Sequence, residues 1–225
     1  MKICVFGGTF DPWTISHQQI IDKLYELDEF SFIHVVPTIV NYHRNGKKPW
    51  LSDFQKTECI RAALYKHGYS VSGFSPYCSN TPYGKDGCAT RILIDDRELR
   101  FREMLLESQN STGVANELIS GRRFIDTLLG IKVSYPKTTE VYTAIGSDSA
   151  EKLRSWYHYD DIINNTKIIV VGGRSGTNVP SDIPIDRTIT LGDAFSDVSA
   201  SRVREVFAEH DDGFEMLLDY ILEKY

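Results

Sequence analysis

The sequence of 225 residues lacks the features of several large classes of protein. It has no run of about 18 to 20 consecutive apolar residues, so we expect no membrane-spanning helix. The first residues, MKICVFGG, have the pattern of a strand rather than of a signal peptide. Its four cysteines are too few and too scattered for a disulfide framework, which is typical of a reducing compartment. We therefore expect a soluble, cytoplasmic protein.

An excess of positive charge is also absent. Lys and Arg together number 25 against 31 Asp and Glu, which gives a formal charge of -6 at pH 7. Without an extended basic face, nucleic acid is a poor candidate for a partner. The content of 41% hydrophobic and 12% aromatic residues is enough to bury a core, which excludes a disordered or fibrous chain.

Patterns of strand and helix alternate along the chain. Strand patterns occur at 2–6, 32–37, 69–74, 141–146, 167–173 and 187–191, and helix patterns at 18–27, 51–68, 122–134, 149–165, from about 199, and at 214–225. This alternation predicts an α/β fold, with a doubly wound, Rossmann-like parallel sheet and helices on both faces. Ser52 is the expected N-cap of the second helix.

The alternation stops between residues 75 and 120. This stretch combines a turn-rich segment, a short charged helix and a polar linker. About 45 residues are marginal for an independent core, so we expect an insertion in a single domain of residues 1–225, which ends in a helical segment at about 199–225. Cys78 and Cys88 in the insertion are too far apart for a CxxC half-site, so no metal site is predicted.

Residues 7–17, GGTFDPWTISH, lie where the first strand ends and the first helix begins. Ligands bind at this edge of an open parallel sheet. The two glycines let the backbone approach a phosphate, and a helix N-terminus attracts an anion. Thr14 and His17 share one face of the first helical turn and can reach the same phosphate. Taken alone, a histidine at a helix start also fits a capping or packing role.

A second segment of this kind is VSASRVR at residues 198–204. Ser199 and Ser201 are expected to begin a helix, with hydroxyl and N–H groups available to an anion. Arg204 follows one turn into the helix, where it can act as a charge clamp. By itself the segment also fits an ordinary capped helix.

The two segments together carry a family resemblance. GGTFDPxTxxH resembles the signature of the nucleotidyltransferase superfamily, the adenylyl- and cytidylyltransferases with a (His/Thr)-x-Gly-His motif. VSASRVR is similar to that superfamily's Ile-Ser-Ser-Thr-x-(Ile/Val)-Arg motif, with Ser16 and Ala200 as departures. The resemblance implies a HUP-like nucleotidyltransferase fold. It implies catalytic roles for His17, Thr14 and Arg204, and ATP contacts for Gly7, Gly8, Thr9, Phe10, Ser199 and Ser201.

Residues 145–174 resemble the part of bacterial nicotinate-mononucleotide adenylyltransferases that reads Gly-x-Asp-Ser, then Trp-Tyr, then a strand ending in Arg. The resemblance implies that Gly146 and Asp148 contact the adenosine ribose of ATP. It implies acceptor contacts for His43, Arg44, Asp126, Thr127, Trp156 and Tyr157. Phe124 stands where the family has a threonine that helps to hold the nicotinate end, which leaves the choice between acid and amide open.

The function implied is transfer of AMP from ATP to nicotinate mononucleotide in NAD biosynthesis. This predicts two small-molecule partners, ATP and a pyridine mononucleotide, with Mg²⁺ as cofactor, and leaves a homo-oligomer open. A first alternative changes the acceptor to nicotinamide mononucleotide or phosphopantetheine. A second, suggested by Ser16 and Ala200, is a nucleotide-binding regulatory protein without turnover.

Overall fold

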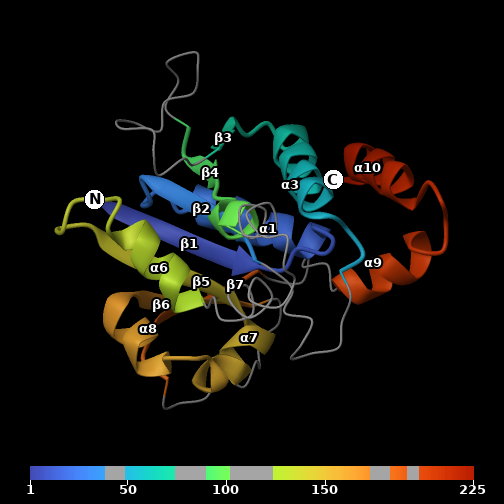
Figure 1. Cartoon of the computed structure of the whole chain (residues 1–225). Coiled ribbons are helices and arrows are strands. Elements are labelled where there is room, and N and C mark those ends of the chain that lie inside the picture. Colours follow the sequence, from blue (N-terminus) through green and yellow to red (C-terminus); the bar gives the residue numbers. More distant parts are fainter. Residues whose placement is uncertain (39–48, 74–89, 102–123, 173–182, 192–197) are drawn as a thin grey trace, which may run out of the picture.

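The computed structural model describes residues 1–38, 49–73, 90–101, 124–172, 183–191 and 198–225. A seven-stranded sheet in the order β3-β4-β2-β1-β5-β6-β7 runs through the molecule, and every neighbouring pair is parallel (Figure 1). The strands are β1 (Lys2–Gly8), β2 (Phe32–Pro37), β3 (Val71–Gly73), β4 (Ile92–Ile94), β5 (Glu140–Gly146), β6 (Lys167–Gly172) and β7 (Ile185–Thr190). The predicted parallel sheet is confirmed.

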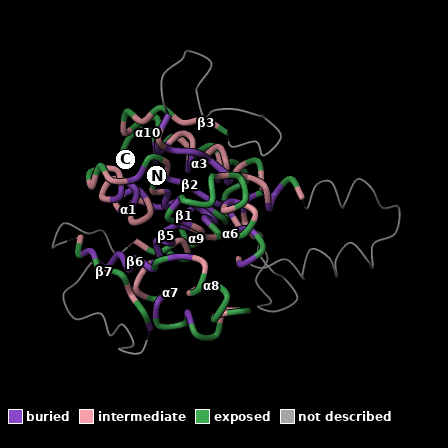
Figure 2. Tube along the Cα trace, turned by 90° about the vertical axis from the view of Figure 1, so that its left-hand side faces the viewer, coloured by how far each residue is buried: buried purple, intermediate pink, exposed green. Residues whose placement is uncertain are grey.

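Helices cover both faces of the sheet, because alternate strand residues point to opposite sides. Cys4 and Phe6 pack against one group of helices, and Ile3 and Val5 pack against another. The first group is α1 (Ile15–Glu26), α3 (Asp53–Lys66), α9 (Ala200–Phe207) and α10 (Gly213–Lys224); the second is α6 (Phe124–Lys132), α7 (Ser147–Lys152) and α8 (Tyr159–Asn165). The buried residues follow the central strands and the helix sides that face them (Figure 2). This arrangement confirms the doubly wound fold.

The order of the strands places a crevice beside β1. The chain passes from β1 to β2 on one side, whereas β5, far along the sequence, pairs with the other side of β1. The connections that follow β1 and β5 therefore diverge at the carboxyl edge of the sheet. In open α/β sheets this point of divergence is where ligands bind.

Strand β4 is absent from the sequence prediction, which placed no strand in residues 75–120. This prediction is wrong at Ile92–Ile94, which pairs with both β2 and β3. Three consecutive buried residues show no alternation and are too few to give a periodic signal. Residues 97–101 are helical, as expected for the charged segment. Cys78 and Cys88 lie outside the described residues, and the limits of the domain stay a prediction.

The helix predicted at 149–165 is divided into α7, a 3-10 turn at Leu153–Ser155, and α8. The backbone becomes extended at Trp156 and takes a left-handed conformation at His158, with φ of 56°. Periodicity does not detect such a break because the apolar residues on both sides keep a helical spacing.

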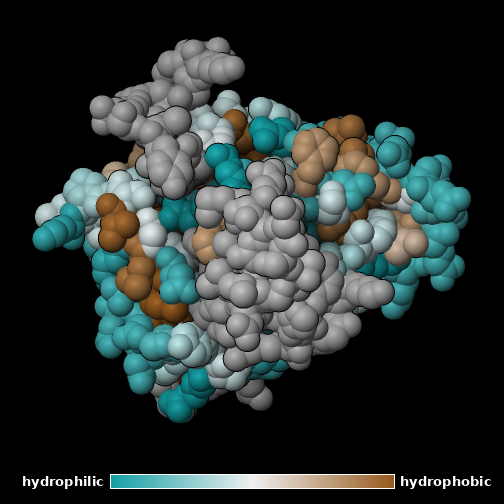
Figure 3. Space-filling view, in the orientation of Figure 1, coloured by the Kyte–Doolittle hydropathy of each residue, from teal (hydrophilic) through white to brown (hydrophobic). Residues whose placement is uncertain are grey.

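The remaining helices begin close to their predicted starts. Ser52 caps α3 and accepts a hydrogen bond from the backbone N–H of Gln55, as predicted. No helix in the part of the chain that the structure describes has the length and apolar character needed to cross a membrane. Apolar surface is visible over α6 and around α3 and α10 (Figure 3), where Val133 and Phe54 are among the exposed side chains.

Candidate active site

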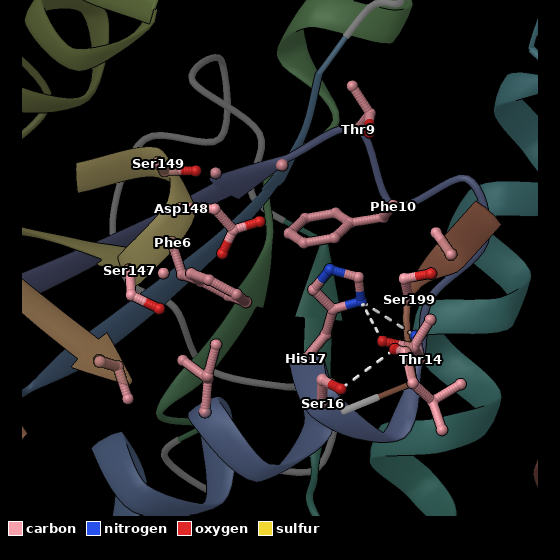
Figure 4. A pocket seen from close by; sticks show the side chains of 17 residues that line it. Phe6, Thr9, Phe10, Thr14, Ser16, His17, Ser147, Asp148, Ser149 and Ser199 are labelled. Carbon is pink, nitrogen blue, oxygen red and sulfur yellow. Dashed lines mark hydrogen bonds between the residues drawn. The ribbon is translucent and has the colours of Figure 1, made fainter. Parts of the chain in front are cut away.

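A cavity of about 410 Å³ opens at the carboxyl ends of β1 and β5. Its wall combines the segment after β1, the first turn of α7 and the start of α9 (Figure 4). The lining residues are Phe6, Gly7, Gly8, Thr9, Phe10, Thr14, Ser16, His17, Ile20, Gly146, Ser147, Asp148, Ser149, Val171, Val198, Ser199 and Ala200. The structure thus joins the two segments that the sequence singled out, which are far apart along the chain.

His17 is held in one orientation by Thr14, the N-cap of α1. The backbone N–H of Thr14 donates to Nδ1 of His17 at 3.0 Å, and the Thr14 hydroxyl lies 2.9 Å from the same nitrogen. His17 therefore takes the place of the Glu or Gln in a capping box. Because a backbone N–H can only donate, Nδ1 is an acceptor, and the proton of the neutral ring is on Nε2. Nε2 faces the cavity (Figure 4).

Three aromatic rings surround the imidazole of His17. The ring of Phe10 lies 5.1 Å away edge-on, that of Trp13 lies 5.4 Å away, and that of Phe6 lies 6.3 Å away, measured between centroids. Burial among these rings lowers the pKa of His17 to about 4, although the charge of Asp148 acts in the opposite direction. At pH 7 His17 is therefore a neutral hydrogen-bond donor rather than a cation. The sequence analysis did not single out Phe6 or Trp13, although Trp13 lies inside the motif.

The lowered pKa of His17 predicts a pH-dependent stability. The unfolded chain, with a histidine pKa near 6.5, takes up a proton before the folded chain does, so stability falls as the pH falls from about 6.5 towards 4. Between pH 7.5 and pH 5 the free energy of unfolding should fall in both the wild-type chain and His17→Gln. We expect this fall to be about 2 kcal/mol smaller in His17→Gln than in the wild-type chain, as measured by urea unfolding. His34, whose pKa is also lowered by burial, is present in both proteins. An equal loss in the two proteins would contradict this prediction.

The paired glycines have different surroundings. A Cβ on Gly8 would lie 2.6 Å from the ring of Phe10. The backbone of Phe10 has a positive φ of 43°, and its ring folds back over the segment. A Cβ on Gly7 would lie 3.4 Å from the ring of Phe124. Gly8 is thus required by the position of Phe10, and Thr9 is exposed at the rim of the cavity.

Asp11 fastens the segment after β1 to the start of α3. Its buried carboxylate accepts hydrogen bonds from the backbone N–H groups of Trp50, at 3.0 Å, and Leu51, at 2.9 Å. The role of this carboxylate is structural, because both of its oxygens are bound to backbone groups outside the cavity wall. The sequence alone gives no indication of partners about 40 positions away.

The second segment meets the first through Arg204. Its guanidinium donates to the backbone carbonyl of Asp11 and, at 2.9 Å, to the hydroxyl of Ser201. Ser199 caps α9 by accepting from the backbone N–H of Arg202 at 3.3 Å. Ser199 lines the cavity, whereas Ser201 and Arg204 are not among its lining residues. In this structure Arg204 therefore links the two segments.

The residues predicted to contact ATP on the β5 side lie in the cavity wall. Gly146 is the N-cap of α7, and a Cβ there would meet nothing closer than 3.7 Å. The carboxylate of Asp148 points into the cavity, towards the ring of His17 (Figure 4). It is the only acidic side chain among the described residues that line the cavity.

The predicted acceptor residues are only partly brought together. Trp156 packs edge-on against Phe124, with centroids 5.2 Å apart, and Phe124 in turn lies next to Gly7. Thr127 is buried in α6 and its hydroxyl donates to Glu98, so it does not line the cavity. Two predicted residues are exposed, Tyr157 and Asp126; two lie outside the described residues, His43 and Arg44.

Comparison with known proteins assigns the family. The family described as "Cytidylyltransferase-like" matches residues 5–206. The chain belongs to the cytidylyltransferase-like family. The matched range extends from β1 to the end of α9, so this cytidylyltransferase-like protein has both cavity segments inside the family region.

Relatives of this cytidylyltransferase-like protein match it over most of their own length. One from Fusobacterium nucleatum, described as "Probable nicotinate-nucleotide adenylyltransferase", is 23% identical over 215 residues, which cover 94% of this chain and 90% of the relative. A protein of the same description from Aliarcobacter butzleri is 25% identical, over 78% of this chain and 73% of the relative. The predicted nucleotidyltransferase class is confirmed.

Solved structures support the fold. Plasmodium falciparum nicotinic acid mononucleotide adenylyltransferase complexed with NaAD superposes with a TM-score of 0.61 at 18% identity, over 99% of this chain and 95% of that one. The same enzyme complexed with APC gives a TM-score of 0.58 at 16% identity, over 99% of this chain and 94% of that one. The predicted α/β nucleotidyltransferase fold is confirmed.

Proposed function

We propose that this chain transfers the adenylyl group of ATP to nicotinate mononucleotide. An oxygen of the acceptor's 5′-phosphate attacks the α-phosphorus of ATP, and the bond from that phosphorus to the oxygen of the β-phosphate breaks. The products are the deamido-NAD dinucleotide and pyrophosphate. The observation that carries the proposal is the cavity in which a neutral His17 donor and the N-termini of α1 and α9 face the same space. The descriptions of the relatives agree with this reaction.

Little covalent work is required of the protein in this reaction. A phosphate monoester is already a nucleophile at pH 7, so catalysis comes from alignment and from stabilisation of charge on the α-phosphate and on the leaving pyrophosphate. Nε2–H of His17 is the donor to the α-phosphate, and Thr14 orients it through Nδ1. The first turn of α9, capped by Ser199, receives the leaving group.

The cavity suits Mg²⁺ that enters with ATP. The described residues contain no group of three or more His, Cys, Asp or Glu side chains that could hold a metal ion. Mg²⁺ retains several waters and is bound mainly by substrate phosphates in sites of this kind. Asp148, whose carboxylate lines the cavity, would hold the ion, and the ion would neutralise phosphate charge during transfer.

The pair of Phe124 and Trp156 supports a second acceptor, nicotinamide mononucleotide. The ring of Phe124 lies beside Gly7 and packs edge-on against Trp156, which gives an apolar surface on which a pyridine ring can stack. Because Phe124 offers no hydrogen bond to a carboxylate, this surface does not by itself favour the acid over the amide.

The test is release of pyrophosphate from Mg-ATP with nicotinate mononucleotide, nicotinamide mononucleotide or phosphopantetheine supplied separately. We expect release with nicotinate mononucleotide above the blank without acceptor. Release with the amide alone would select the second candidate. Binding of ATP without release for any acceptor would contradict both and favour the regulatory protein.

A further inference from the structure

Ser16 forms a side-chain bond between the two halves of the cavity. It lies in the first turn of α1, next to His17, and its hydroxyl donates to the backbone carbonyl of Val198 at 3.1 Å (Figure 4). Val198 immediately precedes Ser199, the N-cap of α9. The bond spans 182 positions of the sequence, and both of its residues line the cavity.

Apolar packing and one arginine also hold α9, and the side chain of Val198 packs against the apolar core that includes α1. Val203 and Phe207 anchor the middle and the end of α9 in the apolar core. The guanidinium of Arg204 reaches the carbonyl of Asp11 from one turn inside the helix. The hydrogen bond from Ser16 instead holds the carbonyl of Val198, which directly precedes the N-cap and the first-turn backbone N–H groups of α9. Within that turn the backbone N–H of Arg202 already donates to the Ser199 hydroxyl. The N–H groups of Ala200 and Ser201 have no acceptor within the helix itself and are the ones available to an anion.

We propose that Ser16 is a positioning residue that sets the distance between the His17 side and the α9 side of the cavity. This inference rests on the proposed function, in which α9 receives the β- and γ-phosphates. With the Ser16 hydroxyl in place, the backbone N–H donors of α9 are held close to the β- and γ-phosphates of an ATP molecule whose α-phosphate is bound at His17. Without it, the turn before α9 loses its bond to α1, and only the part of ATP beyond the α-phosphate is affected.

The test compares a non-hydrolysable ATP analogue with AMP, which has no β- or γ-phosphate. We expect Ser16→Ala and Ser16→Gly to bind the analogue about fivefold more weakly than the wild-type chain, and to bind AMP equally well, in calorimetric titrations. KM for ATP should rise by the same factor while kcat stays within twofold. A purely structural role would instead lower the melting temperature and weaken the binding of both nucleotides.

Ser134→Ala is the matched control. The Ser134 hydroxyl also donates to a backbone carbonyl, that of Gly130 at 2.9 Å, but it lies after the end of α6, outside the cavity wall. Its affinity for the analogue should equal that of the wild-type chain. Two results would overturn the inference and leave the proposed function intact. One is an unchanged affinity of the Ser16 variants for the analogue, and the other is an equal loss of affinity for the analogue and for AMP. Failure of the wild-type chain to bind the analogue overturns the proposed function as well.

Discussion

His17→Ala is expected to lower kcat for pyrophosphate release by two orders of magnitude or more, roughly the cost of losing one donor to developing negative charge. The loss should be large because His17 is neutral and its proton is on Nε2, so it donates without a change of protonation state. Steady-state assays with Mg-ATP and saturating acceptor measure kcat directly.

His210→Ala is the control for this substitution, because His210 is exposed and lies after α9, outside the cavity. It should keep wild-type turnover. Circular dichroism and the melting temperature establish that His17→Ala is folded. A folded His17→Ala variant with more than a tenth of wild-type kcat would contradict the role given to this side chain.

The main elements of the sheet were predictable because their signals are local. Lys2–Gly8 and Phe32–Pro37 are apolar runs that end in glycine or proline, and the apolar residues of the helix between them repeat at helical spacing. Ile92–Ile94 was not predictable in this way, since a three-residue strand gains its stability from pairing with β2 and β3. Its position depends on tertiary contacts that no window of the sequence contains.

In the candidate site, too, some features could be predicted from the local sequence and others depend on tertiary contacts. His17 and Thr14 were identified because their spacing in one helical turn is a property of the segment itself. The orientation of the His17 ring, its aromatic surroundings and its lowered pKa depend on how the segment folds back on itself. The bond from Ser16 to Val198 joins opposite ends of the chain, so the sequence showed Ser16 only as a departure from a family pattern.

Among the substitutions proposed for this chain, Asp11→Ala is expected to cause the largest fall in the free energy of unfolding. Its carboxylate binds two backbone N–H groups, and Leu51, one of the two donors, is only 2% exposed. Removal of the carboxylate leaves both donors without this acceptor, at a cost of about 1 to 3 kcal/mol each. We expect the free energy of unfolding to fall by about 3 kcal/mol in urea titrations.

The loss should extend to the site, because Asp11 lies in the segment that carries Phe10 and Thr14. When the contact with α3 is lost, the positions of the Phe10 ring and of the backbone N–H that orients His17 are less well fixed, so kcat should fall even in the folded fraction. Asp11→Asn keeps one oxygen acceptor and should lose less than Asp11→Ala. Asp219→Ala, which removes an exposed carboxylate from α10, should change the free energy of unfolding by less than about 0.5 kcal/mol. If Asp11→Ala were as stable as Asp219→Ala, the two bonds to Trp50 and Leu51 would not hold this segment against α3.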